Sequence, residues 1–322
     1  MDMDTERRRI PLYKVRLFGE KIGDTFSFVG ENLKPLLKWM TCVLVPLALL
    51  LSFVSGRYLN AVMSMQRGGE PSFDNLSGFL FWYVALVLSA LLLAVVMPAA
   101  IYGLMRIYEE RDQRLRGLTW VEFKPVFLKL LKRSLVFVVV LVLLGVIVVV
   151  AFGALVALLA STGLNKALGV VAIFLLMVVL LVLLVPLALS QPIYLFEDDI
   201  SLMGALKKSY RLGMRTWWGI IGVSLVLSII VSIVVTVLSL PYAITLLARI
   251  SFFADGGGES FVNSFGFSLL TGVLSFFMFL VSYLCYSLLY IGYAYQYGHA
   301  AEKWEKGNGE LKMENGEWRI EN

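Results

Sequence analysis

The sequence is poor in the residues from which most catalytic and metal sites are built. Its 322 residues include one histidine and two cysteines, and charged residues make up only 16%, against about a quarter in soluble proteins. Cys42 and Cys285 both lie within apolar runs, so no disulfide framework is available. The sequence also has no phosphate-binding glycine loop, no zinc-hydrolase motif and no serine-nucleophile motif.

The single histidine belongs to a pair of residues whose spacing could in principle hold a metal. His299 and Glu302 form an i, i+3 pair on a predicted helix. Metal sites built from helices need further ligands, and none converges on this pair by its spacing. We therefore interpret the two residues as an interfacial polar pair, and we predict no enzyme activity, no cofactor and no metal site.

Apolar residues, by contrast, make up 59% of the chain, and the mean hydropathy is +0.81. Six apolar runs are long enough to cross the hydrocarbon core of a bilayer, which takes about 20 residues. They lie at residues 36–55, 79–102, 134–159, 169–190, 217–240 and 267–293. We predict an all-α polytopic membrane protein in which residues 1–302 form one six-span domain. Residues 303–322 are expected to form a tail, in which Asn315 and Gly316 favour the turn of a short hairpin over residues 311–320.

The basic residues gather on one side of these spans. Of the 28 lysines and arginines, only Arg57, Arg67, Lys166 and Arg249 lie on the side away from the termini, which leaves 24 on the other. Because cytoplasmic loops carry an excess of lysine and arginine, both termini are predicted to be cytoplasmic, in the inner membrane. Anionic lipid headgroups are the expected partners of the net charge of +5. No nucleic-acid partner is predicted, and protein partners and the oligomeric state stay open.

Three amphipathic segments each precede a pair of spans. Apolar or small residues recur at steps of 4, 4, 3 and 4 along residues 18–33, 119–134 and 202–217, which is the spacing of one helical face. We predict three amphipathic interfacial helices on the cytoplasmic surface and a three-fold internal repeat, each unit being one such helix followed by a helical hairpin. Pro125 is expected to kink the middle copy.

The third copy carries the clearest signals. Ser201 is expected to cap its first turn. Lys207, Lys208, Arg211 and Arg215 cluster on one side of the helix, apart from its apolar stripe. These four side chains are predicted to contact lipid headgroups.

Two ladders of hydroxyl-bearing residues lie in the last two spans. One consists of Ser224, Ser228, Ser232, Thr236 and Ser239, and the other of Tyr283, Tyr286, Tyr290, Tyr293 and Tyr297. The serine ladder is interpreted first as a helix-packing face and alternatively as the lining of a polar path. A buried tyrosine hydroxyl needs a hydrogen-bond partner, so we predict that the fifth and sixth spans face each other along the two ladders.

Charge is nearly absent from the spans themselves. Apart from Lys38 near the start of the first run, no span contains Asp, Glu, Lys, Arg or His. Proton relays, ion-coupled transporters and voltage sensors usually need such residues within the membrane. The composition therefore argues against an ion-coupled transporter and leaves room for an apolar or lipid-like ligand.

One short stretch resembles a known family. Residues 205–212, Ala-Leu-Lys-Lys-Ser-Tyr-Arg-Leu, followed by Trp217 and Trp218 at the opening of a span, resemble an element of bacterial six-span membrane proteins. These are the membrane domain attached to some glycerophosphodiester phosphodiesterases and its stand-alone relatives. That family's catalytic residues lie in a soluble domain that this chain lacks, so the resemblance implies a helical domain of the cytoplasmic membrane and no site residues.

These patterns predict a non-enzymatic integral protein of the cytoplasmic membrane, which serves as a scaffold or in lipid and envelope homeostasis. The alternative is a permease or exporter for an apolar or lipid-like solute. The prolines in the spans and the two ladders favour this alternative. A cavity between the fifth and sixth spans, lined by Ser228, Ser232 and Tyr283, would favour the alternative. A tightly packed interior would count against it.

Overall fold

The computed structural model describes residues 9–67, 73–111, 115–161, 166–254, 261 and 264–313. Nearly all of them are helical, none lies in a strand, and six helical segments are long and apolar enough to cross a membrane, which confirms the predicted all-α multi-pass membrane protein. The long helices are α2 (Leu33–Arg67), α3 (Phe73–Glu110), α4 (Trp120–Ser161), α5 (Lys166–Leu184), α8 (Trp217–Ala254) and α10 (Phe265–Met313). The short ones are α1 (Phe18–Glu31), the 3₁₀ helix η1 (Val185–Leu189), α6 (Ser190–Phe196) and α7 (Leu202–Arg215).

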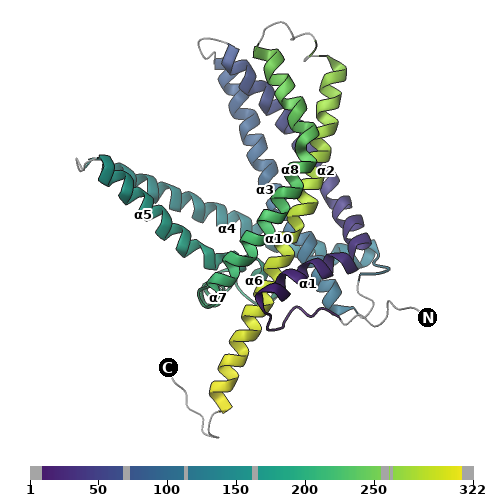
Figure 1. Cartoon of the computed structure of the whole chain (residues 1–322), viewed down its shortest axis with the longest axis vertical. Helices are drawn as coiled ribbons and strands as arrows, with labels where there is room; N and C mark the ends of the chain where they lie inside the picture. The colour runs from purple at the N-terminus through teal and green to yellow at the C-terminus, as the bar shows by residue number, and fades with distance from the viewer. Residues whose placement is uncertain are drawn as a thin grey trace.

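The long helices form two arms that diverge from a common base (Figure 1). Helices α2, α3, α8 and α10 run side by side in a four-helix arm, and α4 and α5 form a two-helix arm inclined to it. We call the base the hub. It consists of α1, η1, α6, α7, the segment of residues 9–17 and the adjoining parts of the long helices.

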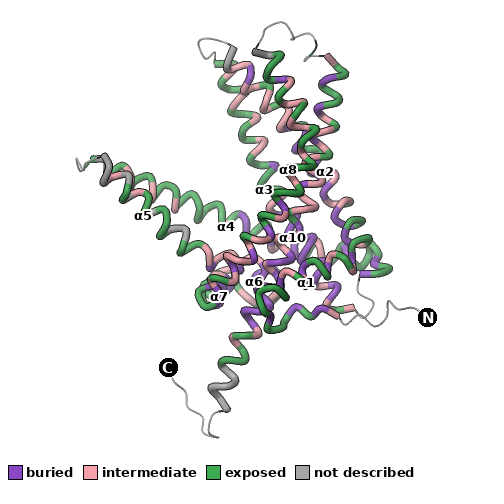
Figure 2. The backbone as a smooth tube through the Cα atoms, in the orientation of Figure 1, coloured by how far each residue is buried: buried purple, intermediate pink, exposed green. Residues whose placement is uncertain are grey.

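Burial is concentrated in the hub, while the arms are mostly exposed (Figure 2). In its most apolar stretch α4 has only 11% of its residues buried within the protein, against 44% for α2. The largest fully buried side chains include Tyr102, Tyr108, Tyr295, Tyr297, Phe28, Phe123, Leu12 and Met40. Apolar arms that stay exposed are consistent with lipid as their solvent, because lipid chains do not drive apolar helices together as water does.

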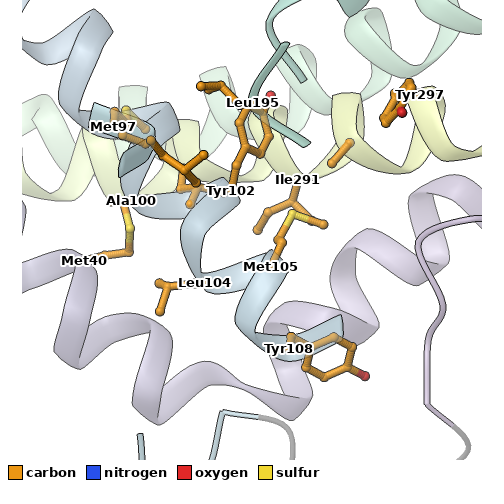
Figure 3. Close-up of a cluster of buried hydrophobic side chains, with 14 of the residues drawn as sticks. Met40, Met97, Ala100, Tyr102, Leu104, Met105, Tyr108, Leu195, Ile291 and Tyr297 are labelled. Atoms are coloured by element: carbon orange, nitrogen blue, oxygen red, sulfur yellow. The ribbon is translucent and has the colours of Figure 1, made fainter. Parts of the chain in front are cut away.

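The last turns of α3 lie at the centre of the hub (Figure 3). Ala99, Ala100 and Leu104 are fully buried there, and Gly103 faces Phe123 of α4. The ring of Phe28 on α1 meets the Tyr108 ring edge to face, with 5.0 Å between their centroids. Small residues on α3 therefore let the other helices approach closely in the hub.

The segment of residues 9–17 binds across the hub without forming a helix. The Leu12 amide donates to Glu109 Oε1 at 2.8 Å, and the Arg16 amide donates to His299 Nδ1 at 3.0 Å. The Arg16 side chain is buried, donates from Nε to Asp24 at 2.7 Å, and lies 4.7 Å from the centre of the Tyr295 ring. These contacts tie the start of the chain to α3, α1 and α10.

Two of the three predicted interfacial helices are separate elements. The break between α1 and α2 is the single residue Asn32 (φ −115°, ψ 19°), and that between α7 and α8 is Thr216 (φ −120°, ψ 24°). Both breaks fall fourteen residues after the start of their amphipathic stripe, which supports an internal repeat. In the middle copy the corresponding residue is Arg133, and there α4 continues without a break, so this copy is not a helix of its own. Pro125 lies inside α4 near its start, and the helix continues past it.

The fourth predicted span is divided, whereas the other five lie within single helices. Helix α5 ends at Leu184, and the 3₁₀ turn η1 contains Pro186. Helix α7 packs on this turn through small residues: a Cβ on Gly213 would lie 2.6 Å from Pro186 Cα, and Ser209 Oγ donates to Pro186 O at 2.7 Å. The carbonyl that loses its helical donor to the proline is that of Val182, and Trp217 Nε1 donates to it at 3.4 Å.

The carboxyl-terminal tail differs from the prediction where it is described. Helix α10 continues to Met313, so residues 311–313 of the expected hairpin are helical. Residues 314–322, with the predicted turn, lie outside the described residues.

Candidate ligand groove between the two arms

Two adjoining cavities lie beside the hub where the arms separate. Their volumes are about 660 and about 470 Å³, within the range of about 300–1,000 Å³ that is usual for ligand sites. Ala188 of η1 and Tyr293 of α10 line both cavities. We call the two together the lateral groove.

The serine ladder lines the larger cavity, on the face of α8 next to η1. Ser224, Ser228 and Ser232 all border it. Ser224 Oγ donates to Ile220 O at 2.6 Å and lies 3.0 Å from the hydroxyl of Tyr293. Ser228, Ser232 and Thr236 are exposed, so the ladder is not the helix-packing face that was its first interpretation. Thr236 lies farther from the hub and does not line this cavity.

The tyrosine ladder lines the smaller cavity, between α3 and α10. Tyr283, Tyr286, Tyr290 and Tyr293 border it together with Gln191 of α6. The fifth rung, Tyr297, lies instead within the hub, where its hydroxyl donates to Glu197 Oε1 at 2.5 Å and lies 3.2 Å from the Tyr13 hydroxyl. The same Glu197 oxygen accepts from Lys208 Nζ at 2.7 Å.

Tyr102 is the most unusual residue of this cavity. Its side chain is fully buried, and its hydroxyl has no hydrogen-bond partner within the described part of the chain. The ring meets that of Tyr290 edge to face at 6.1 Å. Buried hydroxyls are nearly always hydrogen-bonded, so an unpaired one beside a cavity indicates a place for a polar atom of a ligand or a water.

The two ladders meet at a single rung, Ser224 with Tyr293. On α8 a stripe of Ile220, Val223, Leu227 and Val231 is buried and recurs every three or four residues, and Val223 and Leu227 of this stripe lie against Gly292 of α10. A Cβ on Gly292 would lie 2.3 Å from Leu227 Cδ1, so the leucine fits against the glycine. The prediction that the two spans face each other along the ladders therefore holds only at this rung. The apolar stripe beside the serines was the signal that could have located the true contact.

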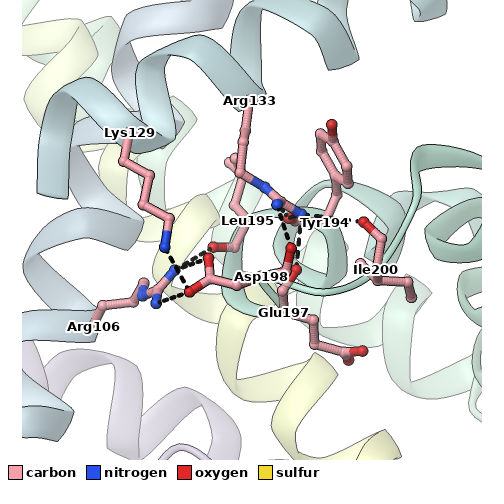
Figure 4. A network of polar contacts seen from close by, with 8 residues as sticks. All are labelled: Arg106, Lys129, Arg133, Tyr194, Leu195, Glu197, Asp198 and Ile200. Atoms are coloured by element: carbon pink, nitrogen blue, oxygen red, sulfur yellow. Dashed lines mark hydrogen bonds and ion pairs between the residues drawn. The ribbon is translucent and has the colours of Figure 1, made fainter.

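A network of ion pairs and hydrogen bonds lies in the hub, around the connection between α6 and α7 (Figure 4). Asp198, in the connection between α6 and α7, accepts from Arg106 Nη1 at 2.9 Å and Nη2 at 2.8 Å, and from Lys129 Nζ at 2.8 Å. The hydrogen bonds from Arg106 hold the pKa of the Asp198 carboxyl well below its usual range, and Lys129 adds to the effect. Because Arg106 belongs to α3 and Lys129 to α4, the network joins the two arms.

The predicted headgroup contacts on α7 have protein partners in part. Lys208 is paired with Glu197, while Arg215 and Arg211 lie 3.9 and 5.6 Å from the ring centre of Trp304. Lys207 is exposed and forms no ion pair with any described residue. Ser201 caps the helix as predicted, since its side chain accepts from the Gly204 amide at 3.1 Å. Contact of the arginines and Lys207 with lipid stays a prediction.

His299 has a structural role that its spacing did not indicate. Its Nδ1 accepts a hydrogen bond from the Arg16 amide. Glu302 forms an ion pair with Lys306 at 3.3 Å. Throughout the described ranges, no three His, Cys, Asp or Glu side chains are grouped so that they could hold a metal ion.

Lys21 gives the hub a specific pH dependence. Its Nζ donates to Gln296 Oε1 at 2.8 Å, and burial, with Lys303 and Arg16 nearby, lowers its pKa to about 8 from 10.5. Because the folded state holds this proton less tightly than the unfolded state, the cost of protonating Lys21 disappears as the pH rises from 8 to 10.5. Over that window we expect the thermal midpoint of the wild type to rise relative to that of Lys21→Met. Lys14→Met, which changes an exposed lysine, is the control and should show no such trend. A constant difference for both variants would contradict the assignment.

No protein-family model, no curated protein and no solved structure matches the chain. The relationship to the membrane domain of glycerophosphodiester phosphodiesterases stays a prediction.

Proposed function

We propose that this chain is a non-enzymatic membrane protein that holds a lipid or another amphiphile in the lateral groove and thereby serves lipid or envelope homeostasis. The observation that carries the proposal is the unpaired Tyr102 hydroxyl beside a cavity at the junction of the arms. A membrane protein with an orphaned hydroxyl in such a place is suited to a ligand that arrives from the bilayer and has both polar and apolar parts.

The unpaired hydroxyl belongs to the hub end of the groove, where Tyr102, Gln191 and Tyr293 line it. Farther along α8, Leu225, Ile229 and Ile233 line the larger cavity together with Ser228 and Ser232. An amphiphile would place its polar part toward the hub, where the unpaired hydroxyl lies, and its chain along the arms.

The proposed orientation puts the hub at the cytoplasmic face of an inner membrane. The sequence places 24 of its 28 lysines and arginines on the side of the termini, where the hub lies. Positive residues favour the cytoplasmic side of spanning helices, and the polar part of the ligand would then lie at the level of the cytoplasmic headgroups.

Filling the groove tests the proposal. Ala188 borders both cavities, so Ala188→Phe is expected to occupy the space that they share and to lower the amount of co-purified lipid several-fold. Ala157→Phe makes the same change on the exposed surface of α4 and serves as the matched control. Lipid retained per protein is measured by native mass spectrometry after mild detergent extraction. Equal retention in the two variants would refute the groove as the site.

The second candidate is a permease or exporter for a lipid-like solute. In its favour, Ser228, Ser232 and Tyr283 do border cavities, as that function requires. However, they border two different cavities, and the contact of Leu227 with Gly292 fills the space between α8 and α10. A fluorescent-lipid exchange assay in proteoliposomes separates the two functions, since a protein that only holds lipid leaves the two leaflets unmixed.

A further inference from the structure

A third cavity lies at the end of the four-helix arm that is far from the hub. It has a volume of about 590 Å³ and is bounded by α2, α8 and α10. We call it the distal cavity. Its polar lining includes Arg57, Asn60, Tyr242 and Arg249. Nothing in the proposed use of the lateral groove involves it.

The charge of this cavity is unusual for its part of the chain. Only four basic residues lie on the side away from the termini, and two of them, Arg57 and Arg249, line this one cavity. Arg57 is exposed and lies 5.3 Å from the ring centre of Phe53. Within the described ranges of the chain, neither arginine forms an ion pair with a carboxylate.

Arg249 is the decisive side chain. It is only 9% exposed, and its sole hydrogen-bond partner in the described part of the chain is the neutral Asn60 side chain, reached through Nη2. Its Nε is buried and has no partner there. A buried charge is costly unless an opposite charge or several hydrogen bonds compensate it. A bound anion would stabilise the Arg249 guanidinium in this way.

Three hydroxyls of the same cavity already have hydrogen-bond partners. Ser52 Oγ donates to Gly272 O at 2.9 Å and also lies against Ser275 Oγ, while Thr271 Oγ1 donates to Phe267 O at 2.8 Å. The two arginines keep free donor capacity, and Tyr242 and Ser268 add two further hydroxyls to the lining. Arginine presents paired N–H groups that match the oxygens of a phosphate or carboxylate, which favours an anionic ligand over a neutral one.

The apolar part of the lining extends from this charged end toward the hub. Leu49 and Phe53 of α2 border the cavity on that side, with Phe276 of α10. Leu49 and Asn60 are eleven residues apart on α2, which corresponds to about 16 Å along the helix axis. This length suits part of an acyl chain beneath a headgroup.

We propose that the distal cavity binds an anionic amphiphile, with its phosphate or carboxylate on Arg249 and Arg57 and its chain against Leu49, Phe53 and Phe276. The ligand class is an anionic lipid of the leaflet away from the hub. A free inorganic anion has the same charge chemistry but lacks the chain, so the experiment distinguishes the two.

The test uses the purified full-length protein and native mass spectrometry. Phosphatidylglycerol and phosphatidylcholine with identical acyl chains are titrated separately, so lipid bound through its chains alone contributes equally to both series. The wild type is expected to prefer phosphatidylglycerol by about tenfold, the effect of one charge-assisted hydrogen bond. Arg249→Gln and Arg57→Gln should each abolish most of this preference. Lys34→Gln removes the same charge from an exposed position near the hub and should leave it unchanged.

Two results would overturn the proposal. The first is an equal preference for phosphatidylglycerol in Arg57→Gln and Lys34→Gln. Because Arg57 is exposed, this comparison can be made even where Arg249→Gln fails to fold. The second is loss of bound phosphatidylglycerol on addition of an equal concentration of inorganic phosphate, which would identify a site for a free anion. Retention of the lipid under that competition supports the proposal.

Discussion

Arg133→Lys is expected to lower the free energy of unfolding of the hub by about 2–4 kcal/mol, the cost of leaving several carbonyls without a charged donor. The Arg133 guanidinium donates to Tyr194 O at 2.7 and 3.0 Å, to Glu197 O at 2.8 Å and to Asp198 O at 2.7 Å, with a longer contact to Ile200 O at 3.4 Å. It also lies 4.3 Å from the centre of the Tyr194 ring. Among the described side chains, it binds the most carbonyls at the end of α6 and in the connection to α7 (Figure 4).

Lysine cannot replace this arrangement, because its single ammonium group cannot span carbonyls that the planar guanidinium reaches at once. The matched control is Lys132→Arg, which makes the reverse exchange at the adjacent exposed position. Thermal unfolding of the detergent-solubilised protein, followed by tryptophan fluorescence, measures both variants. A midpoint for Arg133→Lys as high as that for Lys132→Arg would show that the network does not hold the hub.

The middle copy of the predicted internal repeat differs from the other two at the position of Arg133. Asn32 and Thr216 break the helix at the corresponding positions of the first and third copies, which lets α1 and α7 turn away from α2 and α8. In the middle copy the helix continues, and the Arg133 side chain instead binds the connection that precedes α7. The same position of the repeat thus breaks the helix at Asn32 and Thr216, whereas Arg133 binds a neighbouring connection through its side chain.

The number and type of the spans could be predicted because they depend only on local properties. A run of about 20 apolar residues must be helical in a bilayer, whatever its neighbours are. The interruption at Pro186 and the caps at Ser201 and Asn32 are likewise governed by residues close in sequence. The separation of the α4 and α5 arm could not be predicted in this way, since neither helix carries a polar face that would indicate which side meets other helices.

The candidate sites were predicted less well, for a related reason. The serine and tyrosine ladders were recognised, but their mutual contact was overestimated, because in lipid the fit of Leu227 against Gly292 decides the packing rather than the polar pattern. Tyr102 was one aromatic residue among many until the fold left its hydroxyl without a partner. From the sequence, Arg249 is only one of four basic residues on the side away from the termini. Its burial beside Asn60 depends on the approach of α2 to α8, which the sequence pattern does not indicate.

The second large effect is expected from Gly298→Ala. A Cβ at this position would lie 2.0 Å from the carbonyl oxygen of Leu12, and because the obstacle is backbone, the segment of residues 9–17 must move away. The hydrogen bond from the Arg16 amide to His299 and that from the Leu12 amide to Glu109 would then be lost. Each such bond contributes roughly 1 kcal/mol, so the segment should detach from a hub that otherwise remains folded.

A matched substitution separates this effect from helix propensity. Gly307 lies on the same helix with open space around it, and alanine there should stabilise α10 by about 0.5–1 kcal/mol. Gly298→Ala gains the same propensity, so any destabilisation measures the collision with Leu12. Hydrogen exchange of the Leu12 and Arg16 amides should become at least tenfold faster in Gly298→Ala and stay unchanged in Gly307→Ala, which follows from the loss of about 1.4 kcal/mol of protection. Equal protection in both variants would mean that the segment is held by its apolar contacts, Leu12 and Ile10, rather than by its close approach to α10.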